Sequence, residues 1–231
     1  MLRPAPSARR ITLVASLFLL IAPPAHALDV GYCDTPEKLS ARIKAEGHKI
    51  VAGMERLGVS LNQGGTAAYG ANLVTATPDL TRWYMVRGDK PISERSSRMC
   101  VSAAGRNLEI NDHRREGPPT VTRYRFDRAK ALAECKEVEQ RFVVDENTGI
   151  HCNELNDGVR LLEERLNERI ALRGTTDQGT LMTVVANPDG DKTFRMLATA
   201  PAGATGIALG GRGFAFSSWV VAVLNKRASR D

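Results

Sequence analysis

The segment Val-Thr-Ala-Thr-Pro-Asp at residues 74–79 resembles the segment Val-Val-Ala-Asn-Pro-Asp at residues 184–189. At the same spacing of 110 residues, Trp83-Tyr84 stands opposite Thr193-Phe194. Gly105-Arg106 resembles Gly211-Arg212 at a spacing of 106, and the difference of four falls in a loop, where insertions are tolerated. Similarity at a fixed spacing is the signature of a repeated structural unit. The chain is therefore predicted to contain a duplicated unit.

Each unit is predicted to begin with a helix, because apolar residues recur at helical steps upstream of both matched segments. In the first half the apolar stripe consists of Leu39, Ile43, Ile50, Met54 and Leu57, with Gly58 as the stop. In the second half it consists of Leu155, Val159, Leu162, Leu166 and Ile170, with Gly174 as the stop.

Three strands are predicted to follow each helix. In the first half they lie near residues 67–76, 82–87 and 99–104, and in the second near residues 181–186, 193–199 and 205–209. Pro78-Asp79 and Pro188-Asp189-Gly190 are turn signals between two of these strands. The predicted fold class is α+β, with two tandem units that each pack a helix on an antiparallel meander.

The first 27 residues have the features of a secretory signal peptide. Arg3, Arg9 and Arg10 precede an apolar run over residues 11–22, and Ala25-His26-Ala27 is a small-x-small cleavage site. The apolar run is too short for a bilayer core, which needs about 20 residues. We therefore expect a protein that is exported to the periplasm or secreted, with no membrane span in its mature part. The formal charge of the whole chain is +6, a mild excess that does not indicate a nucleic-acid partner.

The remaining chain is divided into a first unit (residues 28–110), a connector with a helix (residues 111–151) and a second unit (residues 152–231). The connector contains the break Gly117-Pro118-Pro119 and a helical pattern over residues 127–142. It is interpreted as a linker that docks a third helix.

The four cysteines, Cys33, Cys100, Cys135 and Cys152, all lie after the predicted cleavage site. An even number in an exported chain favours two disulfides, for which three pairings are possible. Cys33 and Cys152 both precede the helix of their unit, whereas Cys100 has Gly206 as its counterpart. The repeat therefore favours the pairs Cys33–Cys100 and Cys135–Cys152.

No catalytic, metal or cofactor motif is present in the sequence. His48, His113 and His151 are far apart, and no nucleophile elbow, phosphate-binding loop or dinucleotide fingerprint occurs. We expect no metal and no cofactor, and whether the protein is an enzyme stays open, with a non-catalytic role favoured. Gly210-Gly211-Arg212-Gly213 is predicted to form a turn or a bulge.

Two features could form an interface with a partner. Arginine and tyrosine are typical of binding hot spots, and the connector contains Arg114, Arg115, Arg123, Tyr124 and Arg125. Trp83 and Tyr84 are neighbours on a predicted strand, so one points inward and the other outward. Trp83 is therefore included among the possible partner-binding residues.

Two short stretches, Ala-Asn-Pro-Asp-Gly (186–190) and Cys-Val-Ser-Ala-Ala-Gly (100–105), resemble small uncharacterised exported proteins of proteobacteria. This resemblance implies an envelope location and no activity. The tandem plan is also similar in architecture to beta-lactamase inhibitor proteins, from which no residue is carried over.

The first hypothesis is a non-catalytic periplasmic or secreted protein that binds another protein or an envelope component through a sheet face or the arginine-rich connector. The alternatives are an exported hydrolase with an unrecognised acid–base site, which two close carboxylates would favour, and a structural subunit of an envelope assembly, which an apolar exposed patch would favour.

Overall fold

The computed structural model describes residues 27–56, 70–90, 96–114, 130, 153–190 and 192–229. The first half contains β1 (Cys33–Asp34), α1 (Pro36–Ala45), β2 (Lys49–Arg56), β3 (Gly70–Ala76), β4 (Arg82–Gly88) and β5 (Met99–Ile110). The second half contains β6 (Asn153–Glu154), α3 (Leu155–Leu166), β7 (Arg169–Thr176), β8 (Leu181–Ala186), β9 (Phe194–Thr199), β10 (Ala204–Phe216) and α4 (Ser218–Ala228).

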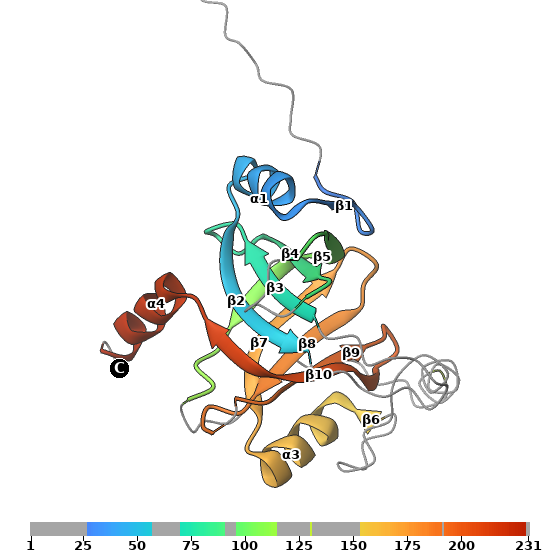
Figure 1. Ribbon diagram of the computed structural model, residues 1–231. Helices are drawn as coiled ribbons and strands as arrows, with labels where there is room; N and C mark the ends of the chain where they lie inside the picture. The colour runs from blue at the N-terminus through green and yellow to red at the C-terminus, as the bar shows by residue number, and fades with distance from the viewer. Residues whose placement is uncertain are drawn as a thin grey trace, which may run out of the picture.

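The main body is a closed antiparallel β-barrel of eight strands (Figure 1). The order β5-β4-β3-β2-β10-β9-β8-β7 returns to its start because β5 also pairs with β7. The short strands β1 and β6 add to β5 and β10. The predicted α+β class with two tandem units is therefore wrong: the fold is mostly β, and the two halves share one barrel.

The two halves have the same order of elements and equivalent strand pairings. In the first half Ala76 pairs with Trp83, which pairs with Gly105. In the second half Ala186 pairs with Phe194, which pairs with Gly211. A four-stranded meander leaves two unpaired edges, and the pairs β2–β10 and β5–β7 satisfy the edges of both meanders at once. Closure explains why the units do not stand side by side as separate domains, and the duplication itself stays a prediction.

Both predicted helices end earlier than their apolar stripes suggest, and each is followed at once by a strand. After α1 the amide of His48 donates to the carbonyl of Ile43, and the amide of Gly47 donates to Lys44. With Gly47 at a φ of +78°, this is a Schellman motif, which terminates a helix. After α3 the left-handed residue is Asn167, at a φ of +52°. The apolar residues beyond these points, such as Met54 and Ile170, belong to β2 and β7.

Apolar residues fill the barrel and also join two helices to its outer wall. The largest buried cluster includes Trp83, Phe194 and Phe214, together with methionines of β2, β4 and β9. Leu39 and Ile43 of α1 pack on the outward side chains of β4 and β5, and the apolar face of α3 packs on β7 to β10. Along β10 the register shifts between Arg212 and Ala215, where Gly213 has a φ of +72°. This confirms the predicted bulge in the glycine-rich segment.

The disulfide between Cys33 and Cys100 is present and joins β1 to β5, as predicted. The two cysteines of the second predicted disulfide, Cys135 and Cys152, lie outside the described residues. A disulfide is compatible with an oxidising, exported location. Among the described residues, none of the helices has the length and apolar character needed to cross a membrane.

Candidate binding surface on helix α4

Helix α4 docks on the barrel through one face, which contains its two buried residues. The amide of Ser217, just before the helix, donates to the carbonyl of Val51 in β2. Val220 and Leu224, one turn apart, are buried in the same cluster as Val51. Figure 1 shows the rest of α4 standing out from the side of the barrel. The opposite face of this helix is therefore available to solvent.

An apolar stripe on the flank of α4 begins at Trp219, which is partly buried against the core, and continues onto β2. Trp219, Val223 and Lys226 follow at steps of four and three, which places them on one face of the helix. The indole nitrogen of Trp219 donates to the carbonyl of Ile50, at 2.5 Å. The Nζ atom of Lys49 stands 6.0 Å from the centre of the Trp219 ring, at the outer limit of a cation–π contact. We call these five residues, Lys49, Ile50, Trp219, Val223 and Lys226, the α4 surface.

Exposed large apolar side chains are concentrated here. Only three are found among the described residues, and two of them, Ile50 at 49% exposed and Val223 at 41%, belong to the α4 surface. The third, Val30, lies near β1. A cluster of exposed apolar side chains marks an interaction site more strongly than scattered single ones do.

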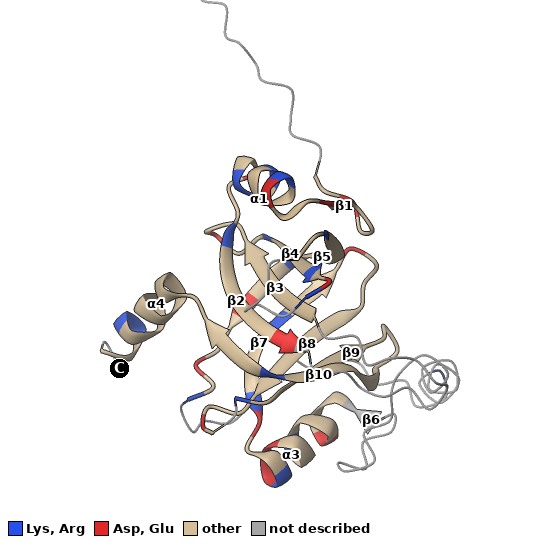
Figure 2. Cartoon of the chain, in the orientation of Figure 1, with Lys and Arg blue, Asp and Glu red and all other residues tan. Residues whose placement is uncertain are grey.

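The part of the chain from Lys192 to Arg230, which includes α4, contributes only basic charges to this surface. The sequence from Lys192 to Arg230 contains no acidic residue, and the last turn of α4 contains Lys226 and Arg227. Figure 2 shows blue for basic residues on α4 and no red for acidic ones. The α4 surface therefore combines apolar and cationic groups.

The predicted partner-binding residues are placed only in part. Arg114 is exposed, binds the carboxylate of Asp112 through two nitrogens and donates to Asn225 of α4, at 3.2 Å. The start of the arginine-rich connector therefore lies beside α4. Arg115, Arg123, Tyr124 and Arg125 fall outside the described residues.

Trp83 is not available to a partner, so its inclusion among the binding residues is wrong. Its side chain is 1% exposed and lies inside the barrel, where its indole nitrogen donates to the carbonyl of Arg106, at 3.1 Å. Alternation along β4 then places Tyr84 on the outer wall, but α1 covers it and leaves it 1% exposed. Neither aromatic residue of the pair reaches solvent.

His113 lies buried at the end of β10, next to the start of α4. Its ring makes edge contacts with Phe214 and Phe216, with ring centres 5.3 Å apart in both cases. Burial lowers the pKa of His113 to about 4, against the opposing effect of Asp112. At neutral pH the ring is therefore uncharged and acts as part of the apolar packing.

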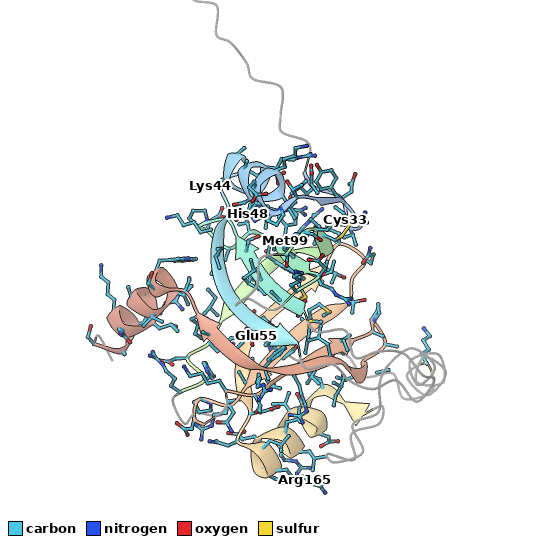
Figure 3. All side chains as sticks on the ribbon, viewed as in Figure 1. Cys33, Lys44, His48, Glu55, Met99 and Arg165 are labelled. Atoms are coloured by element: carbon cyan, nitrogen blue, oxygen red, sulfur yellow. A yellow bond between two sulfur atoms is a disulfide. The ribbon has the colours of Figure 1, made fainter. Side chains whose placement is uncertain are left out.

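A second group of polar side chains lies beneath α1, where the sequence analysis found no site. His48 stacks on Tyr84 with ring centres 4.4 Å apart, and the Tyr84 hydroxyl donates to Glu46, at 2.5 Å. Burial lowers the pKa of His48, and burial together with Glu46 raises the pKa of Tyr84. Figure 3 labels His48 close to the end of α1. We call Glu46, His48 and Tyr84 the α1 cluster.

No group of three or more His, Cys, Asp or Glu side chains that could hold a metal ion occurs in the part of the chain that the structure describes. A barrel hosts many unrelated activities, so the fold alone assigns none. Comparison with protein-family models, with curated proteins and with solved structures finds no match for this chain.

Proposed function

We propose that this protein is a non-catalytic exported protein that binds an anionic component of the cell envelope through its α4 surface. The observation that carries the proposal is the pairing of two exposed apolar side chains, Ile50 of β2 and Val223 of α4, with the lysines Lys49 and Lys226 of the same two elements. The absence of acidic residues from Lys192 to Arg230 supports a partner of negative charge.

The partner chemistry that fits best is an anionic lipid surface. Tryptophan favours the boundary between lipid headgroups and acyl chains, because its ring is apolar and its N–H is polar. Val223 is 41% exposed and adds apolar area to α4, and Lys226, three residues later, lies on the same face of the helix. Lysine side chains bind anionic headgroups with about 1 kcal/mol each near the surface. An interfacial helix uses this combination of apolar and basic groups.

The hydrolase alternative gains less support from the described residues. The best placed acid–base groups are those of the α1 cluster, with His48 5% and Tyr84 1% exposed. A substrate would reach them only if α1 moved away. The structural-subunit alternative calls for a broad apolar patch, whereas the α4 surface is small and contains two lysines.

The proposal is tested by cosedimentation of the purified protein with vesicles of phosphatidylcholine, with and without phosphatidylglycerol. We expect binding only to vesicles with the anionic lipid, and weaker binding at high salt because salt screens the lysine charges. Lys226→Glu should weaken binding about fivefold or more, since each lysine contributes about 1 kcal/mol. Val223→Asp should weaken it further, because a carboxylate would enter the apolar boundary.

The matched control is Arg160→Glu on α3, an exposed helix site away from α4, since Figure 2 shows α3 at the bottom of the view and α4 at the left. This change makes the same charge difference as Lys226→Glu and should leave binding unchanged. Equal losses of vesicle binding in both variants would show that binding depends only on net charge. That result would contradict the assignment of the binding surface to α4. Binding to an envelope protein but to no vesicle would show that the partner is not the lipid.

A further inference from the structure

The first buried residue of the described chain is Leu28, which directly follows the predicted cleavage site. Ala27 is exposed, whereas Leu28 is 3% exposed and packs with Leu39 and Ile43 of α1. The backbone nitrogen of Leu28 is also buried, and it donates to the hydroxyl of Tyr84, at 3.2 Å. The backbone thus changes from exposed to buried across the Ala27–Leu28 bond.

The surroundings of the Leu28 nitrogen are suited to a positive charge. The hydroxyl of Tyr84 accepts from Leu28 and donates to the carboxylate of Glu46, at 2.5 Å. The three groups therefore form a chain that runs from a backbone nitrogen to an anion. As an amide, the Leu28 nitrogen has one proton to donate, whereas an ammonium has three and a full charge.

We propose that the Ala27–Leu28 bond is a processing site, and that the Leu28 ammonium released there binds to Tyr84 and Glu46. The protease class is an endopeptidase that accepts small residues three positions and one position before the cut, which Ala25 and Ala27 supply. Water adds across the peptide bond, so that Ala27 leaves with a carboxylate and Leu28 keeps an amine that is protonated at neutral pH.

The charged end then forms a charge-assisted hydrogen bond to Tyr84 with Glu46 behind it, which is stronger than the bond of a neutral amide. The segment that follows is held as well. Gly31 donates to Val101 of β5, Val101 donates to Tyr32, and Cys33 is bonded to Cys100. The mature chain is thus fixed to the barrel from its first residue.

The same burial sets the order of events. A protease has to place the scissile bond in an extended form in its active site, and the nitrogen of this bond is buried under α1 once the protein has folded. Cleavage therefore precedes the docking of Leu28. A folded, oxidised precursor should resist the peptidase, and an unfolded precursor should be cut.

The test begins with N-terminal sequencing of the protein that is exported from cells. We expect Leu28 as the first residue. The second step compares chains that begin at Leu28 with chains that begin at Ala27, each with Glu46 or with Glu46→Gln. We expect the extra residue to lower the Tm by about 3 °C when Glu46 is present, because it removes the pair between the Leu28 ammonium and the Glu46 carboxylate. In the Glu46→Gln variant this pair is already absent, so the extra residue should lower the Tm by much less.

A second measurement separates this anchoring from general destabilisation. The rate at which an acylating reagent labels the Leu28 amine should rise several-fold in Glu46→Gln. A control, Glu164→Gln on α3, should change neither the labelling rate nor the effect of the extra residue. A different N-terminus in the exported protein, or equal losses of Tm with and without Glu46, would overturn the proposal.

Discussion

The indole of Trp83 in the first half of the chain lies against Gly174 in the second half. A methyl group at position 174 would stand 2.6 Å from the indole nitrogen, closer than carbon atoms pack in proteins. The glycine at 105 is in contact with the same ring, since a methyl group there would lie 2.5 Å from one of its carbons. The barrel interior thus accepts its largest side chain only because two strands of its wall have no side chain there.

Gly174→Ala is expected to destabilise the protein by about 1–3 kcal/mol, because the added methyl group forces Trp83 to shift in a packed interior. Gly158 of α3 serves as the control, since a methyl group there would meet no atom within 4 Å. Gly158→Ala should stabilise the protein by about 0.5–1 kcal/mol through helix propensity. Urea unfolding of both variants provides the measurement. Similar stability for Gly174→Ala and the parent would show that the contact is loose.

Acid should destabilise the protein through His113. Its pKa in the fold is about 4, below the value of 6.5 for an unburied ring, so the fold favours the neutral form. The stability gained from this is complete above pH 6.5 and is lost as the pH falls towards 4, with a total of about 3 kcal/mol. Unfolding midpoints should therefore decrease between pH 7 and pH 4.5. The variant His113→Leu should flatten this decrease, and an unchanged pH profile would rule out His113 as its source.

The ion pair between Arg195 and Glu168 should be essential for stability, because the carboxylate is 0% exposed. Arg195→Met removes this guanidinium from beside the buried carboxylate, and removing one member of a buried ion pair costs about 3–5 kcal/mol. Arg160→Met on α3 removes an ion pair whose side chains are 70% and 60% exposed, and should have almost no effect. Thermal unfolding of the two variants distinguishes the cases. Equal and small losses would show that water reaches Glu168.

Loss of the disulfide between Cys33 and Cys100 should lower the stability of the protein, because the unfolded chain then gains conformational freedom. This gain is larger when the loop that the disulfide closes is longer. Cys33 and Cys100 are 67 residues apart, which corresponds to about 4 kcal/mol in the chain-entropy model. The double change Cys33→Ser with Cys100→Ser should show this loss in urea unfolding. The change Cys135→Ser with Cys152→Ser tests the second predicted disulfide in the same assay. If that variant matched the parent, Cys135 and Cys152 would not be joined.

The strands with clear turn signals could be predicted from the sequence. The segment 181–186 was predicted to the residue, because Pro188-Asp189-Gly190 marks its end and half of its residues are β-branched. Residues 82–87 and 193–199 were also predicted within a residue or two. The disulfide between Cys33 and Cys100 followed from the order of elements in the repeat.

The strands β2 and β7 were missed because each begins within four residues of a helix and continues its apolar pattern. Ile50 and Met54 are four residues apart, which fits a helix, but Ile50 is 49% exposed on a strand and Met54 is buried. The signal that could have separated them was Gly47, whose left-handed conformation ends α1. Without β2 and β7, each unit has three strands, and nothing in the sequence indicates that four-stranded meanders join edge to edge.

The sequence predicted no residue of the α4 surface itself. It predicted Arg114, which lies beside α4. Residues 219–224 form an apolar run in the sequence, and Val220 and Leu224 of this run are buried. The exposed side of the same helix depends on Ile50, which comes from a strand 169 residues earlier. Contacts of that range follow from barrel closure and have no local signature.

Because the barrel closes between β2 and β10, it cannot close until its last strand has been synthesised. β2 is the first long strand to be synthesised and β10 the last, and they are neighbours in the finished barrel. A nascent chain that has completed β5 therefore has a bare strand edge on both sides until the final 30 or so residues arrive, and such edges recruit other chains. The disulfide between Cys33 and Cys100, by contrast, needs only the first 100 residues. Oxidation can thus fix the first half in a half-open form, and truncations near the C-terminus should yield aggregates instead of a smaller folded protein.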